Sequence, residues 1–271
     1  MGSRALRLLV PLAMLAGPVP AATLLPLDAE DAALLPPGVL ELIVGAEGLY
    51  GFQPPFRDVE RDQWSAPVVA VNAGLGERAE AQFRWEALAV DDEPTSQEPA
   101  YFRYDAGDAR LFTKIRVLAP GDFGVERLPA TALHFGMKLP NASFRKRIGT
   151  DEADFFGGGL LSTEFLGARL HANLGMAILG NPGLTRGQDD HFLYRFAAEA
   201  PGPFEALRFF AEVSGSEGSR FENDRHGGRL GARLGGERLA GYVGASAAFD
   251  ELGEDFGVRF GLVYRLRAYS P

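Results

Sequence analysis

Three side chains of types used in hydrolysis lie close together in the sequence: Ser162, His171 and Asn173. A serine nucleophile needs a general base and a group that orients this base, all within hydrogen-bond reach. In a strand, His171 and Asn173 would share a face, and Ser162 on a neighbouring strand would complete a set suited to lipid hydrolysis. Because no serine-hydrolase motif surrounds Ser162, a histidine held in a hydrogen-bond network is the simpler interpretation.

Metal and cofactor chemistry have little support in the sequence. The chain has 4 histidines and no cysteine, and no two histidines stand at metal-ligand spacing in one motif. There is no glycine-rich phosphate loop ending in Lys-Ser or Lys-Thr. We therefore expect no metal and no cofactor, and the lack of cysteine excludes disulfides and thiol chemistry. A net charge of -9 and a pI of about 5.1 argue against a nucleic-acid partner.

The elements that must position these side chains are predicted by alternation of apolar and polar residues. Every second residue from Phe256 to Leu266 is apolar, and Arg259 and Arg265 are among the residues between them. A period of two predicts a strand with one apolar and one polar face. The same alternation occurs clearly at 80–87, 110–117, 133–139, 169–178 and 207–213, and more weakly at 39–47, 67–75, 153–165, 190–199, 228–234 and 239–249.

These segments predict about twelve strands, most of them near the ~9–11 residues that a tilted strand needs to cross a bilayer. A soluble β-sandwich also alternates, but here nearly every polar face carries Arg, Lys or Glu and no segment is apolar throughout. We therefore predict an all-β fold, a closed antiparallel transmembrane β-barrel of about 12 strands over residues 39–271. The odd-numbered connections are mostly long and the even-numbered ones mostly short, which places both termini in the periplasm.

The polar faces of the strands define the candidate site, because in such a barrel they point into the lumen. The residues that we predict to line the lumen are Glu80, Arg84, Glu86, Lys114, Arg116, Lys138, Arg169, His171, Asn173, Arg195, Arg208, Glu212, Arg233, Arg259 and Arg265. Both signs of charge are present, so opposite charges would pair across the lumen and brace it. A barrel of this size is expected to be nearly filled by such side chains, which argues against a wide, general porin.

The N-terminal residues are typical of a secretory signal peptide. Arg4 and Arg7 precede an apolar run over 8–16, and Val19-Pro20-Ala21 offers a cleavage site of small residues. We expect residues 1–21 to be a cleaved signal and residues 22–38 to be a short periplasmic lead-in to the barrel. Export together with a barrel predicts location in a bacterial outer membrane.

Residues 133–175 carry a family resemblance. The pieces are Gly136-Met137-Lys138-Leu139-Pro140, Gly149 to Phe155, the glycine-rich stretch Gly157 to Thr163, and Leu170 to Gly175. Together with the closing strand 256–266, they resemble the outer-membrane proteins of the "meta-pathway of phenol degradation" transporter type. The resemblance implies a barrel of about twelve strands that takes up small hydrophobic or aromatic compounds. One departure is that the chain continues past the closing strand through Tyr269-Ser270-Pro271, where such barrels end on an aromatic residue.

Three functions remain open at this stage. The first is a transporter or channel for small hydrophobic or aromatic compounds. The second is a structural barrel with a plugged lumen, and the third is an outer-membrane lipid hydrolase that uses His171. The expected partners are outer-membrane lipid and lipopolysaccharide, the outer-membrane assembly machinery, and a small hydrophobic solute.

Overall fold

The computed structural model describes residues 24–54, 59–94, 100–125, 128–180, 188–218, 224–250 and 252–268. The expected signal peptide, residues 1–21, and the C-terminal Tyr269-Ser270-Pro271 lie outside them. The strands are β1 (Val39–Phe52), β2 (Arg61–Gly74), β3 (Ala79–Asp92), β4 (Tyr101–Ala106), β5 (Ala109–Leu118), β6 (Ala130–Leu139), β7 (Asp154–Phe165), β8 (Ala168–Gly180), β9 (Gln188–Pro201), β10 (Leu207–Gly218), β11 (Arg225–Gly235), β12 (Leu239–Ala248) and β13 (Phe256–Arg267).

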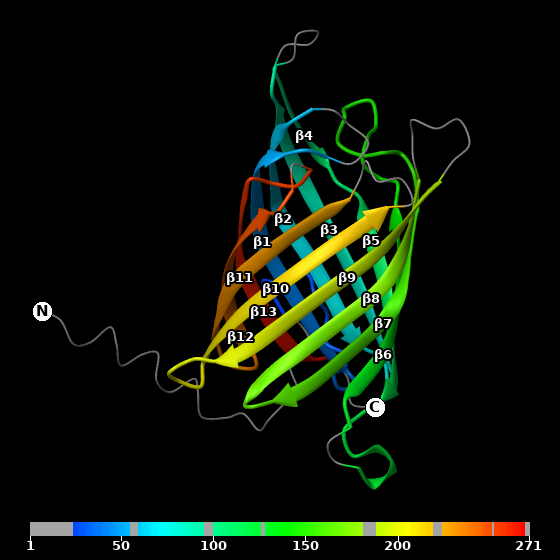
Figure 1. The fold of residues 1–271 in the computed structure, drawn as a ribbon, viewed down its shortest axis with the longest axis vertical. Coiled ribbons are helices and arrows are strands. Elements are labelled where there is room, and N and C mark those ends of the chain that lie inside the picture. Colours follow the sequence, from blue (N-terminus) through cyan, green and yellow to red (C-terminus); the bar gives the residue numbers. More distant parts are fainter. Residues whose placement is uncertain are drawn as a thin grey trace, which may run out of the picture.

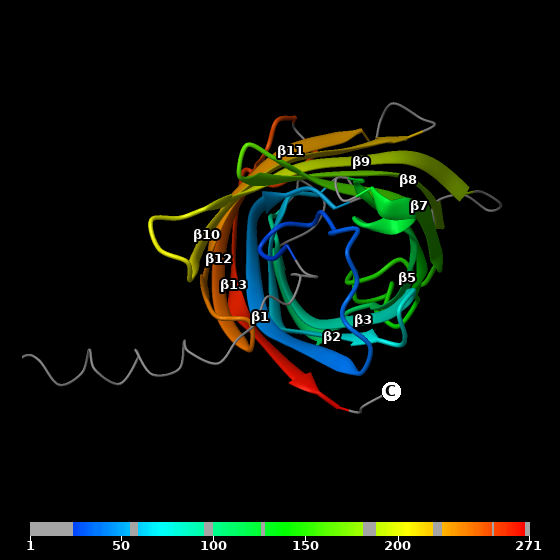
Figure 2. The same ribbon diagram turned by 90° about the horizontal axis from the view of Figure 1, so that it is seen from below.

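The strands form one antiparallel sheet that closes on itself (Figures 1 and 2). Strand β1 pairs with β2 on one side and with β13 on the other, so the two ends of the chain meet in the barrel wall. Strands β4 and β5 pair with successive parts of β3, Ala87 lying opposite Ala106 and Arg84 opposite Arg110. The result is a closed barrel of 12 strands plus one extra strand, which confirms the predicted fold class.

Several strands are longer than the alternation predicted. Strand β1 continues to Phe52 and β2 begins at Arg61, so the first connection is much shorter than the gap between the predicted strands 39–47 and 67–75. Strand β3 continues to Asp92 in the same way, and β4 follows at Tyr101. The added residues are paired through the backbone, and backbone pairing does not need the side-chain alternation from which the strands were predicted.

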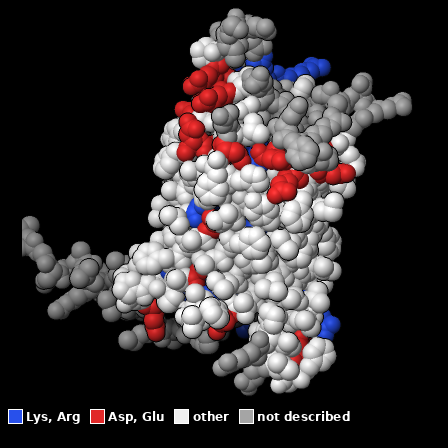
Figure 3. Space-filling view, in the orientation of Figure 1, with Lys and Arg blue, Asp and Glu red and all other residues white. Residues whose placement is uncertain are grey.

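The two faces of the wall differ in chemistry. Outward-facing exposed apolar side chains include Val44, Trp64, Phe83, Leu111, Leu133, Phe155, Leu174, Phe196, Phe209, Leu230, Val243 and Phe260. In Figure 3, few charged residues interrupt the visible body of the barrel, and acidic residues gather toward the end at which β4 lies. An apolar surface of this extent marks contact with a membrane or another apolar partner. Within the described ranges, no helix is long and apolar enough to span a membrane.

The N-terminal stretch before β1 occupies the inside of the barrel. We expected residues 22–38 to be a short periplasmic lead-in, whereas the described residues 24–35 lie within the barrel, against side chains of its wall. Figure 2 shows the start of the described chain, in dark blue, crossing the opening of the barrel. Leu24, Leu27, Ala32 and Leu35 are buried there. The inward face of the wall carries many charged groups, and this segment supplies them with partners. We call residues 24–35 the plug segment.

Candidate functional site

The structure places the predicted lumen residues at inward-facing positions. Those with hydrogen-bond or ion-pair partners are Glu80, Arg84, Glu86, Lys114, Lys138, Arg169, His171, Asn173, Arg208, Glu212, Arg259 and Arg265. The others, Arg116, Arg195 and Arg233, are partly exposed, and their side chains have no such partner within the described part of the chain.

At the end where the chain enters, charges are paired across neighbouring strands. The Arg265 guanidinium lies 2.6 Å from Glu41 Oε2, and Asn72 Nδ2 donates to Glu41 Oε1 at 3.0 Å. Lys114 Nζ lies 3.4 Å from Glu80 Oε1, and both side chains are fully buried. Such pairs brace the wall, and removing one partner would leave a buried charge unpaired.

The plug segment adds its own carboxylates to this set. Asp28 Oδ2 lies 2.6 Å from Arg229 Nη1, and Asp28 Oδ1 lies 2.8 Å from Arg259 Nη1. Burial alone would raise the pKa of Asp28, but Arg229, Arg259 and Arg195 outweigh it and hold this pKa well below its usual range. The docked plug therefore keeps Asp28 ionised.

Two further carboxylates of the plug segment meet cations from other strands. Glu30 Oε2 lies 3.1 Å from Lys114 Nζ and accepts a hydrogen bond from Gln82 Nε2 at 3.2 Å. Burial raises the pKa of Glu30, but Lys114, His134 and the hydrogen bond from Gln82 together lower it by more, so the net shift is downward. Asp31 Oδ2 lies 2.8 Å from Arg169 Nη2.

The backbone of the plug segment is held by side chains of the wall. Glu212 Oε2 accepts hydrogen bonds from the N–H groups of Asp28 and Ala29, at 3.0 and 2.6 Å. Asn173 contacts both sides of Glu30: Oδ1 accepts from its N–H at 2.6 Å and Nδ2 donates to its carbonyl at 2.9 Å. Further along, Glu80 Oε2 accepts from the Leu35 N–H at 2.7 Å. A segment without regular structure thus has several of its buried backbone groups satisfied by the wall.

Glycines in the wall make room for the plug segment. A Cβ added at Gly244 on β12 would lie 2.7 Å from Pro26 Cγ, and one at Gly231 on β11 would lie 2.1 Å from the same atom. At Gly241, also on β12, the nearest atom would be Leu262 Cδ2 at 3.6 Å, an ordinary contact. Close packing against Pro26 therefore excludes side chains at Gly231 and Gly244.

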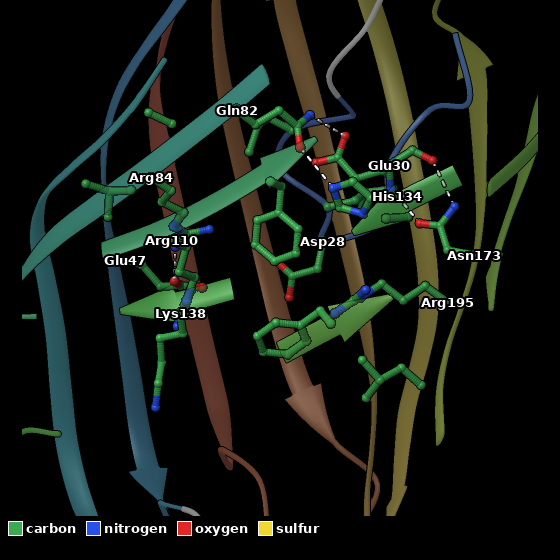
Figure 4. A pocket seen from close by; sticks show the side chains of 18 of the residues that line it. Asp28, Glu30, Glu47, Gln82, Arg84, Arg110, His134, Lys138, Asn173 and Arg195 are labelled. Atoms are coloured by element: carbon green, nitrogen blue, oxygen red, sulfur yellow. Dashed lines mark hydrogen bonds and ion pairs between the residues drawn. The ribbon is translucent and has the colours of Figure 1, made fainter. Parts of the chain in front are cut away.

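Above the plug segment the lumen is hollow. A cavity of about 580 Å³ has Asp28 and Glu30 in its lining and extends along the inside of the wall to Phe52 and Gln63. Its charged lining residues include Glu47, Glu86, Arg84, Arg110, Lys138, Arg195, Arg229 and Arg259. Figure 4 shows Asp28, Glu30, His134 and Arg195 around one part of this space, with Arg84, Arg110, Glu47 and Lys138 in another.

One wall of the cavity is aromatic. The Phe112 ring is stacked on the imidazole of His134, with centroids 4.7 Å apart, and its centroid lies 5.6 Å from that of Phe156. His134 Nε2 is hydrogen-bonded to Gln82 Oε1 at 3.0 Å, which links the ring to Glu30 through the same glutamine. The cavity therefore offers both ring surfaces and guanidinium groups to a solute.

The residues considered for hydrolysis do meet. Ser162 Oγ and His171 Nδ1 are hydrogen-bonded at 2.8 Å, and Asp31 Oδ1 lies 3.9 Å from the same His171 nitrogen. In a catalytic triad, the carboxylate orients the base through its other nitrogen. Ser162 Oγ also accepts the Ala32 N–H at 2.9 Å, and Asn173 holds Glu30 instead of His171. In this state the set acts as an anchor for the plug segment.

Sequence reasoning missed the other half of this site. It did not assign Asp28, Glu30 or Asp31 any role, and it omitted Glu47 and Arg229 from the lumen set. The available signal was an excess of Arg and Lys over Glu among the predicted lumen residues, which calls for carboxylates from elsewhere. Among the described residues, no group of three or more His, Cys, Asp or Glu is placed to hold a metal ion.

Comparisons with known proteins bear on the fold. No family model matches the sequence, and no curated protein matches it. Among solved structures, the COG4313 outer membrane channel from Pseudomonas putida F1 is similar with a TM-score of 0.62 at 10% identity, over 89% of this chain and 100% of that one. The NanC porin gives a TM-score of 0.56 at 6% identity, over 82% and 100%.

The translocator domain of the autotransporter NalP from Neisseria meningitidis is similar as well. Its TM-score is 0.55 at 15% identity, over 84% of this chain and 88% of that one. At such low sequence identities, structural similarity supports a shared fold but does not indicate a shared function. The fold of this chain is therefore that of the bacterial outer-membrane β-barrels.

Proposed function

We propose that the chain is an outer-membrane channel for small hydrophobic or aromatic compounds, closed in the described state by its own plug segment. The apolar outward face supports membrane insertion, since every exposed apolar side chain costs free energy in water. The inward face, with its charged groups, suits a lumen that holds water. We place both termini in the periplasm and the acidic end outside, in contact with lipopolysaccharide, and we propose assembly by the outer-membrane machinery.

The cavity above the plug segment carries this proposal. A volume of about 580 Å³ falls within the ~300–1,000 Å³ typical of small-ligand pockets. Phe112 and Phe156 give the cavity apolar surface for a ring or short hydrocarbon. The resemblance of residues 133–175 to the phenol-degradation transporter type supports the same class of solute.

Solute flux with and without the plug segment tests the proposal. The full-length protein and a variant lacking residues 24–35 would be reconstituted into liposomes or planar bilayers. We expect small conductance from the full-length protein and at least about tenfold more from the deletion variant, because the segment occupies the lumen near the chain entrance. No flux above that of empty membranes in either form would overturn the channel and favour the structural barrel with a plugged lumen.

A hydrolase remains a second candidate because Ser162 Oγ and His171 Nδ1 are hydrogen-bonded at 2.8 Å. If the plug segment leaves, this pair is uncovered, since Asp31 and Ala32 contact it. Turnover of a phospholipid by the deletion variant would then be lost in a further His171→Ala change. A deletion variant that is folded and hydrolyses no phospholipid dismisses this candidate.

A further inference from the structure

We infer that Arg229 and Arg259 form a carboxylate site in the lumen, that Asp28 occupies it as an internal ligand, and that a small carboxylate with an apolar body opens the lumen by taking the place of Asp28. This inference rests on the proposed channel function and adds to it the class of solute and the means of opening.

The geometry around Asp28 is that of a bound carboxylate. Each of its two oxygens has its own guanidinium, with Oδ2 2.6 Å from Arg229 and Oδ1 2.8 Å from Arg259. Charge-assisted hydrogen bonds of this kind are the stronger ones in proteins, and guanidinium groups suit the planar carboxylate. Both arginines belong to the wall, on β11 and β13. The two cations therefore stay in place when the plug segment moves.

The charge balance predicts that the site attracts an anion when Asp28 leaves. The nearest wall carboxylate, Glu47, already lies 2.5 Å from Arg259, 3.8 Å from Arg229 and 3.7 Å from Arg84. Arg84 has a second carboxylate, Glu86, at 3.5 Å. Without Asp28, Glu47 would be the one carboxylate of the described residues left at ion-pair distance from Arg229 and Arg259. Buried charges without partners cost free energy, so the displaced state gains stability from any anion that fits.

A solute in the cavity can reach this site from above. The Asp28 side chain is 36% exposed, and Asp28, Arg229 and Arg259 all line the cavity. The same cavity is lined by Phe112 and Phe156. A carboxylate on an aromatic ring therefore matches the two kinds of surface that the cavity offers, guanidinium and aromatic.

We call the state with the plug segment docked the plug-in state and the state with it displaced the plug-out state. A solute displaces the segment if it binds the plug-out state better than the plug-in state. Asp28 fills the site in the plug-in state, so the carboxylate binds only when the segment has moved. The plug segment has no helix or regular strand of its own. Apart from a turn in which the Leu27 N–H donates to the Leu24 carbonyl, its backbone is held by side chains of the wall. Such a ligand shifts the population by mass action, in proportion to its concentration over its Kd once it is in excess.

Cysteine labelling reports the position of the plug segment directly. The chain has no cysteine, so Ala29→Cys introduces a single thiol at a site that is 3% exposed when the plug is docked. We expect sodium benzoate to speed its reaction with a thiosulfonate reagent by about tenfold or more. Benzyl alcohol, which has the same ring and no charge, should leave the rate unchanged. Glu205→Cys, on an exposed turn, serves as a control that reacts equally in both solutions.

Single-channel recording on the full-length protein gives an independent readout that needs no thiol. Benzoate should raise the open probability, whereas equimolar chloride should not. Asp28→Asn should raise it without benzoate and remove most of the response to benzoate, because the internal ligand is already weakened. Glu205→Gln removes an exposed carboxylate outside the lumen and should behave as the unmodified protein does.

The outcomes separate this inference from the channel itself. If the variant lacking 24–35 conducts but benzoate changes neither labelling nor opening of the full-length protein, the inference is wrong and the channel stands. Equal effects of benzoate and benzyl alcohol would overturn recognition of the carboxylate. If the deletion variant is folded and does not conduct, the proposed channel function itself is wrong, and the inference that rests on it is wrong as well. We expect the deletion variant that also carries Arg229→Gln to bind benzoate about tenfold or more weakly than the deletion variant with Arg229. The reason is the loss of one charge-assisted hydrogen bond.

Discussion

The two halves of the lumen are enclosed by the same strands and differ in what fills them. In the half near the chain entrance, which we call the sealed half, Lys114 and Glu80 are fully buried, and the plug segment binds both of them through Glu30 and Leu35. In the other half, which we call the hollow half, Arg110 is 38% exposed and lies 3.8 Å from its nearest partner, Glu86. The number of strands therefore does not by itself decide whether such a barrel is open.

Comparing the two halves shows that side chains of the wall do not fill the middle of the lumen by themselves. We expected opposite charges to span the lumen, and many pairs do form, but most join neighbouring strands along the wall. Across the middle it is the plug segment that connects distant strands, since Asp28 binds β11 and β13 while Glu30 binds β3 and β5. The cavity persists where no such segment enters.

The largest expected effect is in the sealed half, at Lys114. Lys114→Met would leave Glu80 and Glu30 buried without their shared cation, and breaking a buried pair costs about 3–5 kcal/mol. We expect the folded form on gels to unfold at a much lower temperature and urea unfolding in liposomes to shift accordingly. A variant as stable as the native barrel would show that this half is not braced by charge.

A smaller effect is expected where Pro26 packs against glycine. Gly244→Ala places a methyl group 2.7 Å from Pro26 Cγ, and overpacking of this kind costs about 1–3 kcal/mol. Since Pro26 is part of the plug segment, the strain should be relieved by undocking, with increased conductance. Gly241→Ala on the same strand is the matched control. Equal conductance of the two variants would contradict the idea that docking of the plug segment depends on close packing of Pro26 against Gly244.

Acid should undock the plug segment to a more modest degree. The pKa values of Asp28 and Glu30 are lowered in the docked state, so the stability they add is present above their ordinary values and is lost as pH falls below about 4. Conductance should rise several-fold between pH 6 and pH 3.5 and should stay constant between pH 8 and pH 6.

Replacing both acids tests the origin of this pH dependence. The double change Asp28→Asn and Glu30→Gln removes the groups that titrate on the plug segment, so its conductance should be high already at pH 6. A variant that keeps the full acid response would assign it to wall carboxylates such as Glu212 instead.

The smallest effect is expected in the hollow half, at Arg110. Arg110→Met removes a cation that is partly exposed and weakly paired, and exposed pairs contribute about 0–1 kcal/mol. The unfolding temperature should hardly change, in contrast to Lys114→Met on the same strand. A large loss of stability would show that the two halves are braced alike.

The barrel was predictable because the alternation of apolar and polar residues indicates both faces of each strand. At Phe256 to Leu266 the alternation sets both the element and the direction of each side chain, and the structure leaves Phe260 exposed and buries Arg265. Arg229 was missed because its strand is rich in glycine, which contributes no apolar face to the pattern. Strand ends such as Phe52 were missed because backbone pairing carries them beyond the alternating residues.

The plug segment was not predictable from local pattern. Residues 24–35 have neither period two nor period 3.6, so they read as a linker. Their partners are remote in sequence: the hydrogen bond from Arg259 to the Pro26 carbonyl joins residues 233 positions apart. Only the excess of Arg and Lys over Glu among the predicted lumen residues indicated that carboxylates from outside the strands are needed. This excess does not indicate which carboxylates these are or from which end of the barrel they enter.

The spread of the plug anchors over the wall has a consequence for the order of folding. The first described residues of the chain bind groups on β3, β5, β8, β10, β11 and β13. Before β1 has paired with β13, these groups are not arranged around a common centre. Contacts of such long range form late, after the loop between them has been closed. The stretch that precedes all the strands in the chain is thus among the last to be placed. Protection of the Ala29→Cys thiol from reagents would time the closing of the β1–β13 seam during assembly.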